Sequence, residues 1–198
     1  MSLISKSPIY FGSFLVFHLT PLSFALVNIK PLLPGHVLVC PLRPARRLAD
    51  LTIPETTDLF LTIRRVSRMI QRVYHGTSLN IAIQDGPEAG QTVPHLHAHI
   101  IPRRKGDMDR RGGNDAIYEM MEGREGNVER HLGELVEERR RRELEGEGEG
   151  EVDGMDEDGE NGGGLRGVDN EGRKARTEAE MMEEAFALAR EMEGEGVD

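Results

Sequence analysis

Three histidines alternate with apolar residues in the segment HLHAHIIP, residues 95–102. Side chains of a β-strand point to opposite faces in turn, with a period of two residues. A strand over this segment therefore places His95, His97 and His99 on one face and the apolar residues between them on the other. In an α-helix the same side chains are rotated by roughly 200° per two residues and cannot converge. The spacing predicts a strand that presents three imidazoles together.

Three imidazoles on one face fit three kinds of site. Imidazoles commonly bind zinc, and catalytic zinc sites often use three protein ligands. One imidazole can instead attack an electrophile while its neighbours orient it or donate protons. The third alternative is a set of polar side chains on a solvated sheet face. The spacing alone leaves the metal site and the nucleophile equally open.

The loop before the histidine segment favours the nucleophile. Residues 85–93, DGPEAGQTV, contain two glycines and several backbone N–H donors, and such loops can bind phosphate oxygens. Gln84 and Gln91 add uncharged donors, and no extra carboxylate or cysteine stands directly beside the three histidines. A phosphorus atom attacked by a neutral imidazole fits this set better than a bound metal ion does.

The remaining hydrophobic patterns predict an antiparallel sheet covered by a helix. A helix over residues 52–76 is indicated by apolar residues at every third or fourth position and by the capping-box pattern of Thr52 and Glu55. Strands are expected over residues 9–17, 24–30, 36–42, 79–85 and 95–102. The element order β-β-β-α-β-β predicts an α+β fold with a five-stranded antiparallel sheet and one main helix.

The charges are divided unevenly along the chain of 198 residues, whose net charge is −10. Residues 1–105 hold 12 Lys and Arg against 5 Asp and Glu, which gives +7, and residues 106–198 hold the other 13 against 30, which gives −17. A basic N-terminal module attracts anions such as nucleotides and phosphates. We therefore expect a compact basic module followed by an acidic extension.

Low-complexity sequence interrupts the acidic half. Residues 143–172 consist mainly of Gly, Glu and Asp, a composition that cannot form a packed core and predicts disorder. An amphipathic helix is expected after it, because Thr177 and Glu180 form a second capping box. We therefore expect a folded domain over residues 1–119, an acidic, Gly/Glu-rich and largely disordered linker over 120–172, and a C-terminal helix over 173–193.

The cellular setting is inferred from the single thiol and the hydropathy. Cys40 cannot form an internal disulfide, which favours a reducing compartment. No segment approaches the roughly 18–20 apolar residues that cross a membrane. We expect a cytoplasmic protein, small enough to reach the nucleus, that binds neither membranes nor nucleic acid. The folded module is small and leaves a sheet edge exposed, so we also expect a homodimer.

The histidine segment and its surroundings resemble the histidine triad superfamily, in particular its fragile histidine triad branch. The resemblance rests on three stretches in the same order, residues 22–44, 75–107 and 114–119. The purine-nucleoside phosphoramidase branch continues past its triad into a Gly-Gly stretch, whereas residues 102–106 here read PRRKG.

This resemblance implies a bis(5′-adenosyl)-triphosphatase, which cleaves diadenosine triphosphate to AMP and ADP through a nucleotidyl-histidine intermediate. It implies that His97 is the nucleophile, that His99 contacts the scissile phosphate, and that His95 and His36 orient the cluster. It also implies Mg²⁺ or Mn²⁺ as a companion of the substrate polyphosphate, with no metal ligands from the protein.

The resemblance further implies a set of substrate-binding residues and leaves two other functions open. A nucleotide-binding signalling module with slow turnover would use Tyr118 and the acidic tail as its interaction surface. A nucleoside phosphoramidate hydrolase would use the same nucleophile on another substrate. The implied substrate contacts are Asn28 at the ribose, Gln84 near the phosphates, and Gly90, Gln91, Thr92 and Val93 around the polyphosphate.

Overall fold

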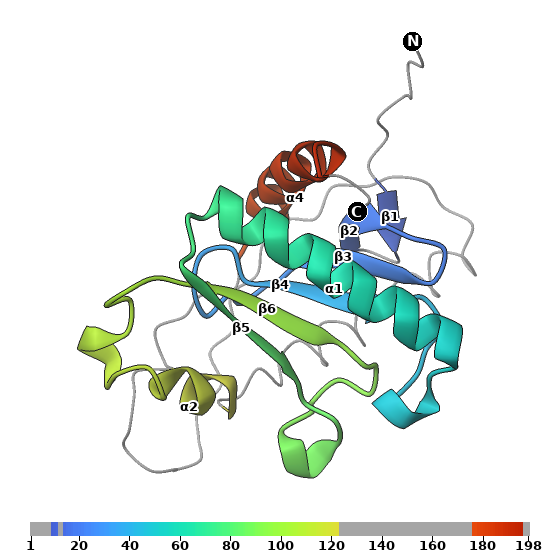
Figure 1. The fold of residues 1–198 in the computed structure, drawn as a ribbon, viewed down its shortest axis with the longest axis horizontal. Coiled ribbons are helices and arrows are strands. Elements are labelled where there is room, and N and C mark those ends of the chain that lie inside the picture. Colours follow the sequence, from blue (N-terminus) through green and yellow to red (C-terminus); the bar gives the residue numbers. More distant parts are fainter. Residues whose placement is uncertain (1–8, 12–13, 123–175, 196–198) are drawn as a thin grey trace, which may run out of the picture.

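One antiparallel sheet forms the centre of the protein, as seen in a computed structural model that describes residues 9–11, 14–122 and 176–195 (Figure 1). The strand order is β1-β2-β3-β4-β6-β5. The predicted α+β architecture is confirmed. The segment expected to form the first strand is divided into the hairpin β1-β2, in which Phe11 pairs with Phe14, so the sheet contains six described strands. The strands are β1 (Ile9–Phe11), β2 (Phe14–Leu19), β3 (Ser23–Val27), β4 (Val37–Pro41), β5 (Ser78–Ile83) and β6 (Ala98–Arg103).

The main helix, α1 (Ile53–Val73), covers one face of the sheet. Its predicted capping box is present, because Thr52 accepts a hydrogen bond from the backbone N–H of Glu55 and the Glu55 carboxylate accepts one from the backbone N–H of Thr52. The helix ends before Gly76, at Tyr74, and His75 takes a left-handed conformation with φ +51°. Its buried apolar stripe includes Leu59, Ile63, Val66 and Ile70.

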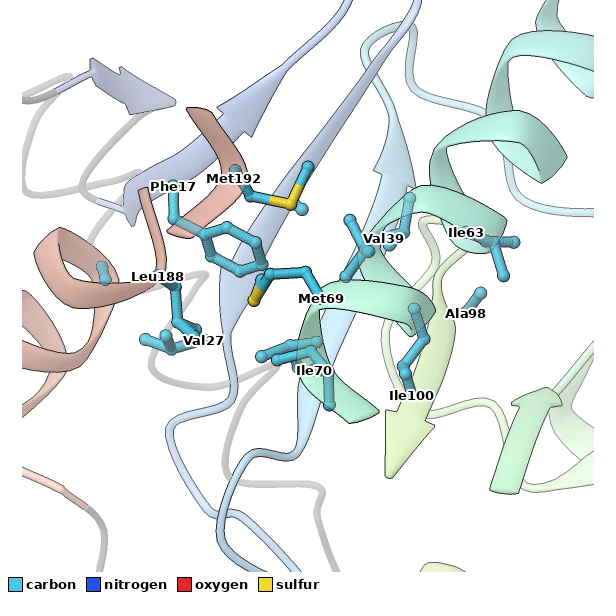
Figure 2. Packing of buried hydrophobic residues seen from close by; sticks show 14 of the residues in the cluster. Phe17, Val27, Val39, Ile63, Met69, Ile70, Ala98, Ile100, Leu188 and Met192 are labelled. Atoms are coloured by element: carbon cyan, nitrogen blue, oxygen red, sulfur yellow. The ribbon is translucent and has the colours of Figure 1, made fainter. Parts of the chain in front are cut away.

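The C-terminal helix, α4 (Glu178–Glu193), packs beside α1 on the same face of the sheet (Figure 1). Leu188 and Met192 of α4 meet Phe17 and Met69 in the largest apolar cluster (Figure 2). The predicted helix and its Thr177 capping box are confirmed. The acidic insert at residues 143–172 lies outside the described residues. No described helix is both long enough and apolar enough to cross a bilayer.

The opposite face of the sheet carries the histidines. Val37 and Val39 of β4 point to the α1 side, whereas Leu38 and Cys40 belong to a separate cluster with residues of β2 and β3. The short helix α2 (Ala116–Glu122) packs against Ile101 of β6 on this second side. Helix α2 was not predicted and continues past residue 119, the expected end of the domain. This second face holds the candidate site.

Candidate active site

The histidine segment bends before it enters β6. The strand begins at Ala98, so the first two histidines precede it, and the predicted strand over 95–102 is wrong at its N-terminal end. Pro94 has no backbone N–H, and the N–H of Leu96 donates to the carbonyl of Ala45 (2.7 Å) outside the sheet. A hydrogen bond to the segment between β4 and α1 therefore replaces sheet pairing in the stretch that holds His95 and His97.

Three imidazoles meet on the histidine face, and one of them comes from a distant part of the chain. The ring centroids of His97 and His99 lie 4.9 Å apart, and those of His99 and His36 lie 5.2 Å apart. The fourth imidazole, of His95, donates from Nε2 to the carbonyl of Pro41 (2.9 Å) and contacts the ring of Phe24. The structure thus brings His36 into the cluster and holds His95 against β4.

Backbone hydrogen bonds assign the tautomers of His36 and His99. The N–H of Leu32 donates to Nδ1 of His36 (3.1 Å), so the His36 hydrogen is on Nε2. That Nε2–H donates to Nδ1 of His99 (2.9 Å), which in turn places the His99 hydrogen on Nε2. His99 Nε2 is buried and has no hydrogen-bond partner among the described residues. The chain of bonds therefore leaves a donor ready for an incoming oxygen.

His97 takes the opposite tautomer to that of His36 and His99. Its Nδ1 lies 2.8 Å from the carbonyl oxygen of His95, which can only accept, so Nδ1 carries the hydrogen. Nε2 of His97 then keeps its lone pair. The site offers one nucleophilic nitrogen and, on the neighbouring ring, one hydrogen-bond donor. A nucleophilic nitrogen beside a hydrogen-bond donor is what a two-step displacement at phosphorus requires.

Burial keeps the imidazoles neutral. Loss of solvation lowers the pKa of His97 below its ordinary value, and the bond to the His95 carbonyl only partly opposes this shift. Burial lowers the pKa of His99 to about 3, with a smaller contribution from the neighbouring His97. Desolvation also lowers the pKa of His95. Near neutral pH the nucleophile therefore needs no deprotonation before it reacts.

The buried neutral state of His99 predicts a pH-dependent stability. Its pKa is about 3 in the folded chain and near the ordinary 6.5 in the unfolded chain, so between these values only the unfolded chain binds the proton. Stability therefore rises with pH across this window, and lowering the pH from 7 to 5 removes about 2 kcal/mol through this group. Urea denaturation at the two pH values measures the difference. In His99→Asn the stability lost between pH 7 and pH 5 should be smaller by that amount. A loss equal to that of the wild type would show that His99 is not buried in its neutral form.

The predicted phosphate loop is held in shape by its own side chains. The Gln91 amide accepts from the N–H of Gly86 (3.0 Å) and donates to the carbonyl of Arg46 (2.9 Å). Asp85 accepts from the N–H of Leu48 (2.9 Å) and pairs with the side chain of Arg47 (3.1 Å). The Gln91 side chain is therefore used to close the loop. The other two predicted loop residues, Thr92 and Val93, lie between this turn and the histidines, with Thr92 exposed and Val93 half-buried.

Gln84 and Gly90 lie against each other at the end of β5. Gly90 has a left-handed φ of +85°, and a Cβ there would lie 2.6 Å from the Gln84 side-chain nitrogen. That nitrogen is also 3.5 Å from the carbonyl oxygen of Met121 in α2. The glycine thus provides the space in which the Gln84 amide is held beside the loop.

Gly90→Ala should disturb substrate binding beyond its effect on stability. An alanine pushes the Gln84 amide away and adds about 1–2 kcal/mol of backbone strain. For the dinucleoside polyphosphate that the resemblance implies as substrate, we expect KM to rise about tenfold, a loss of about 1.4 kcal/mol in binding. Gly113→Ala is the matched control, because Gly113 has φ +92° and nothing within 4 Å of its would-be Cβ. Equal kinetics in both variants would show that Gln84 has no role.

Asn28 directly follows β3 and lies beside His36. Its Oδ1 accepts from the N–H of Lys30 (2.9 Å), and its Nδ2 is 3.3 Å from Nε2 of His36. The resemblance pointed to Asn28, but no residue in the sequence marked the N–H of Leu32, which sets the tautomer of His36, or the carbonyl of Pro41, which holds His95. Backbone groups are common to all residues, so no residue-type signal could have marked them.

Comparison with known proteins places this site in a family. Residues 13–106 match the model of the HIT domain. The bis(5′-adenosyl)-triphosphatase of Dictyostelium discoideum is 52% identical over 118 residues, which cover 57% of this chain and 77% of that protein. The chain belongs to the histidine triad (HIT) family. The HIT domain match contains all four histidines of the site and the loop beside them.

Two further relatives of this HIT family member carry related names. The bifunctional bis(5′-adenosyl)-triphosphatase/adenylylsulfatase FHIT of Arabidopsis thaliana is 50% identical over 117 residues, 59% of this chain and 63% of the relative. The asymmetrical bis(5′-nucleosyl)-tetraphosphatase of Schizosaccharomyces pombe is 52% identical over 124 residues, 61% of this chain and 66% of the relative. The match thus spans slightly less than two thirds of the length of these two relatives.

The described residues contain no group of three or more His, Cys, Asp or Glu side chains arranged to hold a metal ion. The imidazoles of His36 and His97 instead use Nδ1 in hydrogen bonds with the backbone. Among the described residues, the Nδ1 atoms of these two rings are therefore not free to bind a metal ion.

Proposed function

We propose that the protein hydrolyses dinucleoside polyphosphates, and that it cleaves diadenosine triphosphate to AMP and ADP. The observation that supports this most directly is the opposite tautomers of two adjacent rings. The lone pair at Nε2 of His97 provides the nucleophile, and the Nε2–H of His99 provides a donor for a phosphoryl oxygen. The names of the relatives agree with this chemistry.

In the first step, Nε2 of His97 attacks the α-phosphorus. The P–N bond forms as the bond from that phosphorus to the bridging oxygen breaks, and ADP leaves with the bonding electrons. The attacking ring becomes positively charged, and its Nδ1–H remains bonded to the carbonyl of His95 (2.8 Å), which favours that charge. The Nε2–H of His99 stabilises the charge that builds up on a non-bridging oxygen.

In the second step, water attacks the nucleotidyl-histidine. The P–O bond to water forms, the P–N bond breaks, and AMP leaves while a water proton passes to solvent. The lone pair returns to Nε2 of His97, which restores the starting tautomer. One difficult displacement is thus divided into two easier ones, both at the same phosphorus.

The remaining predicted residues are proposed as substrate contacts. Asn28 would bind the ribose, Gln84 would contact the phosphates, and residues 90–93 would surround the polyphosphate chain. The contact with Gly90 supports the assignment of Gln84, because it confines the Gln84 amide beside the loop, and the side-chain bonds of Gln91 give that loop its shape. Mg²⁺ or Mn²⁺ would arrive with the polyphosphate as part of the substrate and reduce its charge.

Product analysis tests the proposal. Purified protein is incubated with diadenosine triphosphate in ¹⁸O-water, and we expect equal amounts of AMP and ADP, with the label in AMP only. Diadenosine tetraphosphate is compared by kcat/KM, because one relative is named for a tetraphosphate. Tight binding without product release would support the signalling module instead. A higher kcat/KM for a nucleoside phosphoramidate would support the phosphoramidate hydrolase.

A homodimer is part of the proposal. Strand β5 ends the sheet order, and Ile81 on this edge strand is 49% exposed, so a second copy would cover both the free edge and an apolar side chain. Sedimentation equilibrium is expected to give twice the chain mass of 22.1 kDa.

A further inference from the structure

Arg176 joins the start of the C-terminal helix to the loop between β3 and β4. Its Nε donates to the carbonyl of Asn28 (3.1 Å), and its Nη2 donates to the same oxygen. Its own backbone N–H donates to the carbonyl of Ile29 (3.0 Å). The side chain is only 19% exposed, and Nη1 pairs with the carboxylate of Glu184 in the second turn of α4. One residue therefore holds two consecutive carbonyls of this loop.

The loop that Arg176 holds sets the tautomer of His36. Asn28 begins the loop, and its backbone N–H donates to the carbonyl of His36 (3.3 Å) at the other end. The Asn28 side chain fixes the first turn through the N–H of Lys30 (2.9 Å). The N–H of Leu32, in the same loop, donates to Nδ1 of His36 (3.1 Å). A shift of this loop would change the bond that places the hydrogen on His36 Nε2.

A second contact restrains the loop from the side of α1. Tyr74, directly after α1, packs against Gly35, where a Cβ would lie only 2.5 Å from the tyrosine ring. The Tyr74 hydroxyl donates to the carboxylate of Glu184 (2.5 Å), which is also the partner of Arg176. Glu184 thus joins Arg176, which holds the loop at Asn28, to Tyr74, which packs against the residue before His36.

We propose that Arg176 is a positioning residue for the active site, through which α4 fixes the His36–His99 pair. The proposal rests on the hydrolase function proposed above. Arg176 does not touch the reacting atoms. It acts through the loop from Asn28 to His36, and the result is a fixed Nε2–H donor on His99. A guanidinium suits this position, because its planar set of donors can bind a carbonyl and a carboxylate at once.

Arg176→Ala is the direct test. We expect kcat for diadenosine triphosphate to fall about 10-fold to 100-fold, with a smaller change in KM, because misplacing a group that acts in the transition state has effects of this size. The ¹⁵N NMR signals of the imidazoles give a readout that a merely structural role would not change. They should show the pure Nε2–H form of His36 and His99 in the wild type and a mixture of tautomers in the variant.

Arg72→Ala is the matched control. Arg72 also joins α1 to α4, through Glu191 (2.5 Å) and Glu195 (2.9 Å), but these contacts lie at the far end of α4 and do not involve the loop. We expect Arg72→Ala to lower stability without changing kcat or the imidazole signals. An equal loss of kcat in both variants would overturn the proposal, and so would wild-type tautomers in Arg176→Ala.

Arg176→Lys keeps the test decisive if the alanine variant does not fold. Lysine keeps the charge but cannot bind the Asn28 carbonyl and the Glu184 carboxylate with one planar group. We expect an intermediate kcat and partly mixed tautomers, and wild-type values for both would overturn the proposal. If the wild-type protein releases no AMP, the hydrolase function fails, but the NMR signals of the variants still decide the role of Arg176.

Discussion

His97→Asn is expected to abolish hydrolysis while leaving nucleotide binding nearly intact. The asparagine amide reaches about as far as Nδ1 of histidine and can still donate to the carbonyl of His95, so the local backbone keeps its contact. The nitrogen that corresponds to Nε2 is absent, and with it the lone pair that attacks phosphorus. We expect kcat to fall on the order of 10⁵-fold, as for loss of the nucleophile in other covalent mechanisms.

Three measurements check this result. AMP release gives kcat, and calorimetry with diadenosine triphosphate gives the dissociation constant of the inactive variant. An alkaline quench followed by intact-mass analysis should find one nucleotidyl group on the wild type and none on His97→Asn. His75→Asn is the matched control, because His75 is exposed and outside the site, and asparagine tolerates its φ of +51°. Turnover above about 1% of wild type in His97→Asn would show that another group attacks.

Local sequence patterns predicted the parts of the fold that depend on burial. The alternation of Leu96, Ala98 and Ile100 correctly identified the residues that pack under α1, all of which are fully buried. The capping boxes at Thr52 and Thr177 identified the starts of both long helices. Periodicity and capping are local properties, so a single sequence contains them.

The same patterns failed where contacts with distant backbone decide the structure. A strand over all three histidines was expected, but the Leu96 N–H bonds to Ala45 and the strand starts three residues later than predicted. The contact between Arg176 and Asn28 joins residues 148 positions apart, and it uses a carbonyl that every residue has. The resemblance to the family pointed to the three imidazoles that the structure brings together and to His95 beside them, whereas the tautomers of His36 and His99 required the coordinates.

A pair of substitutions at His36 should separate its two hydrogen bonds, because asparagine and glutamine each imitate a different imidazole nitrogen. His36→Asn keeps an acceptor near the position of Nδ1 for the N–H of Leu32 but loses the donor to His99. His36→Gln keeps an N–H near the position of Nε2 and loses the other bond. Since His36 is fully buried, each variant leaves one polar group unpaired and should lower the free energy of unfolding by about 1–3 kcal/mol.

The two His36 variants should nevertheless differ in catalysis. Without a donor at its Nδ1, His99 is no longer held as the Nε2–H tautomer, and the hydrogen bond to the phosphoryl oxygen weakens. We expect kcat to fall on the order of 10²–10³-fold in His36→Asn, the size seen for loss of one such donor, and only about tenfold in His36→Gln. Urea denaturation and AMP release measure the two effects separately. If the two variants lost equal amounts of kcat along with their similar losses of stability, His36 would act as a buried packing residue. The donor on His99 would then not depend on it.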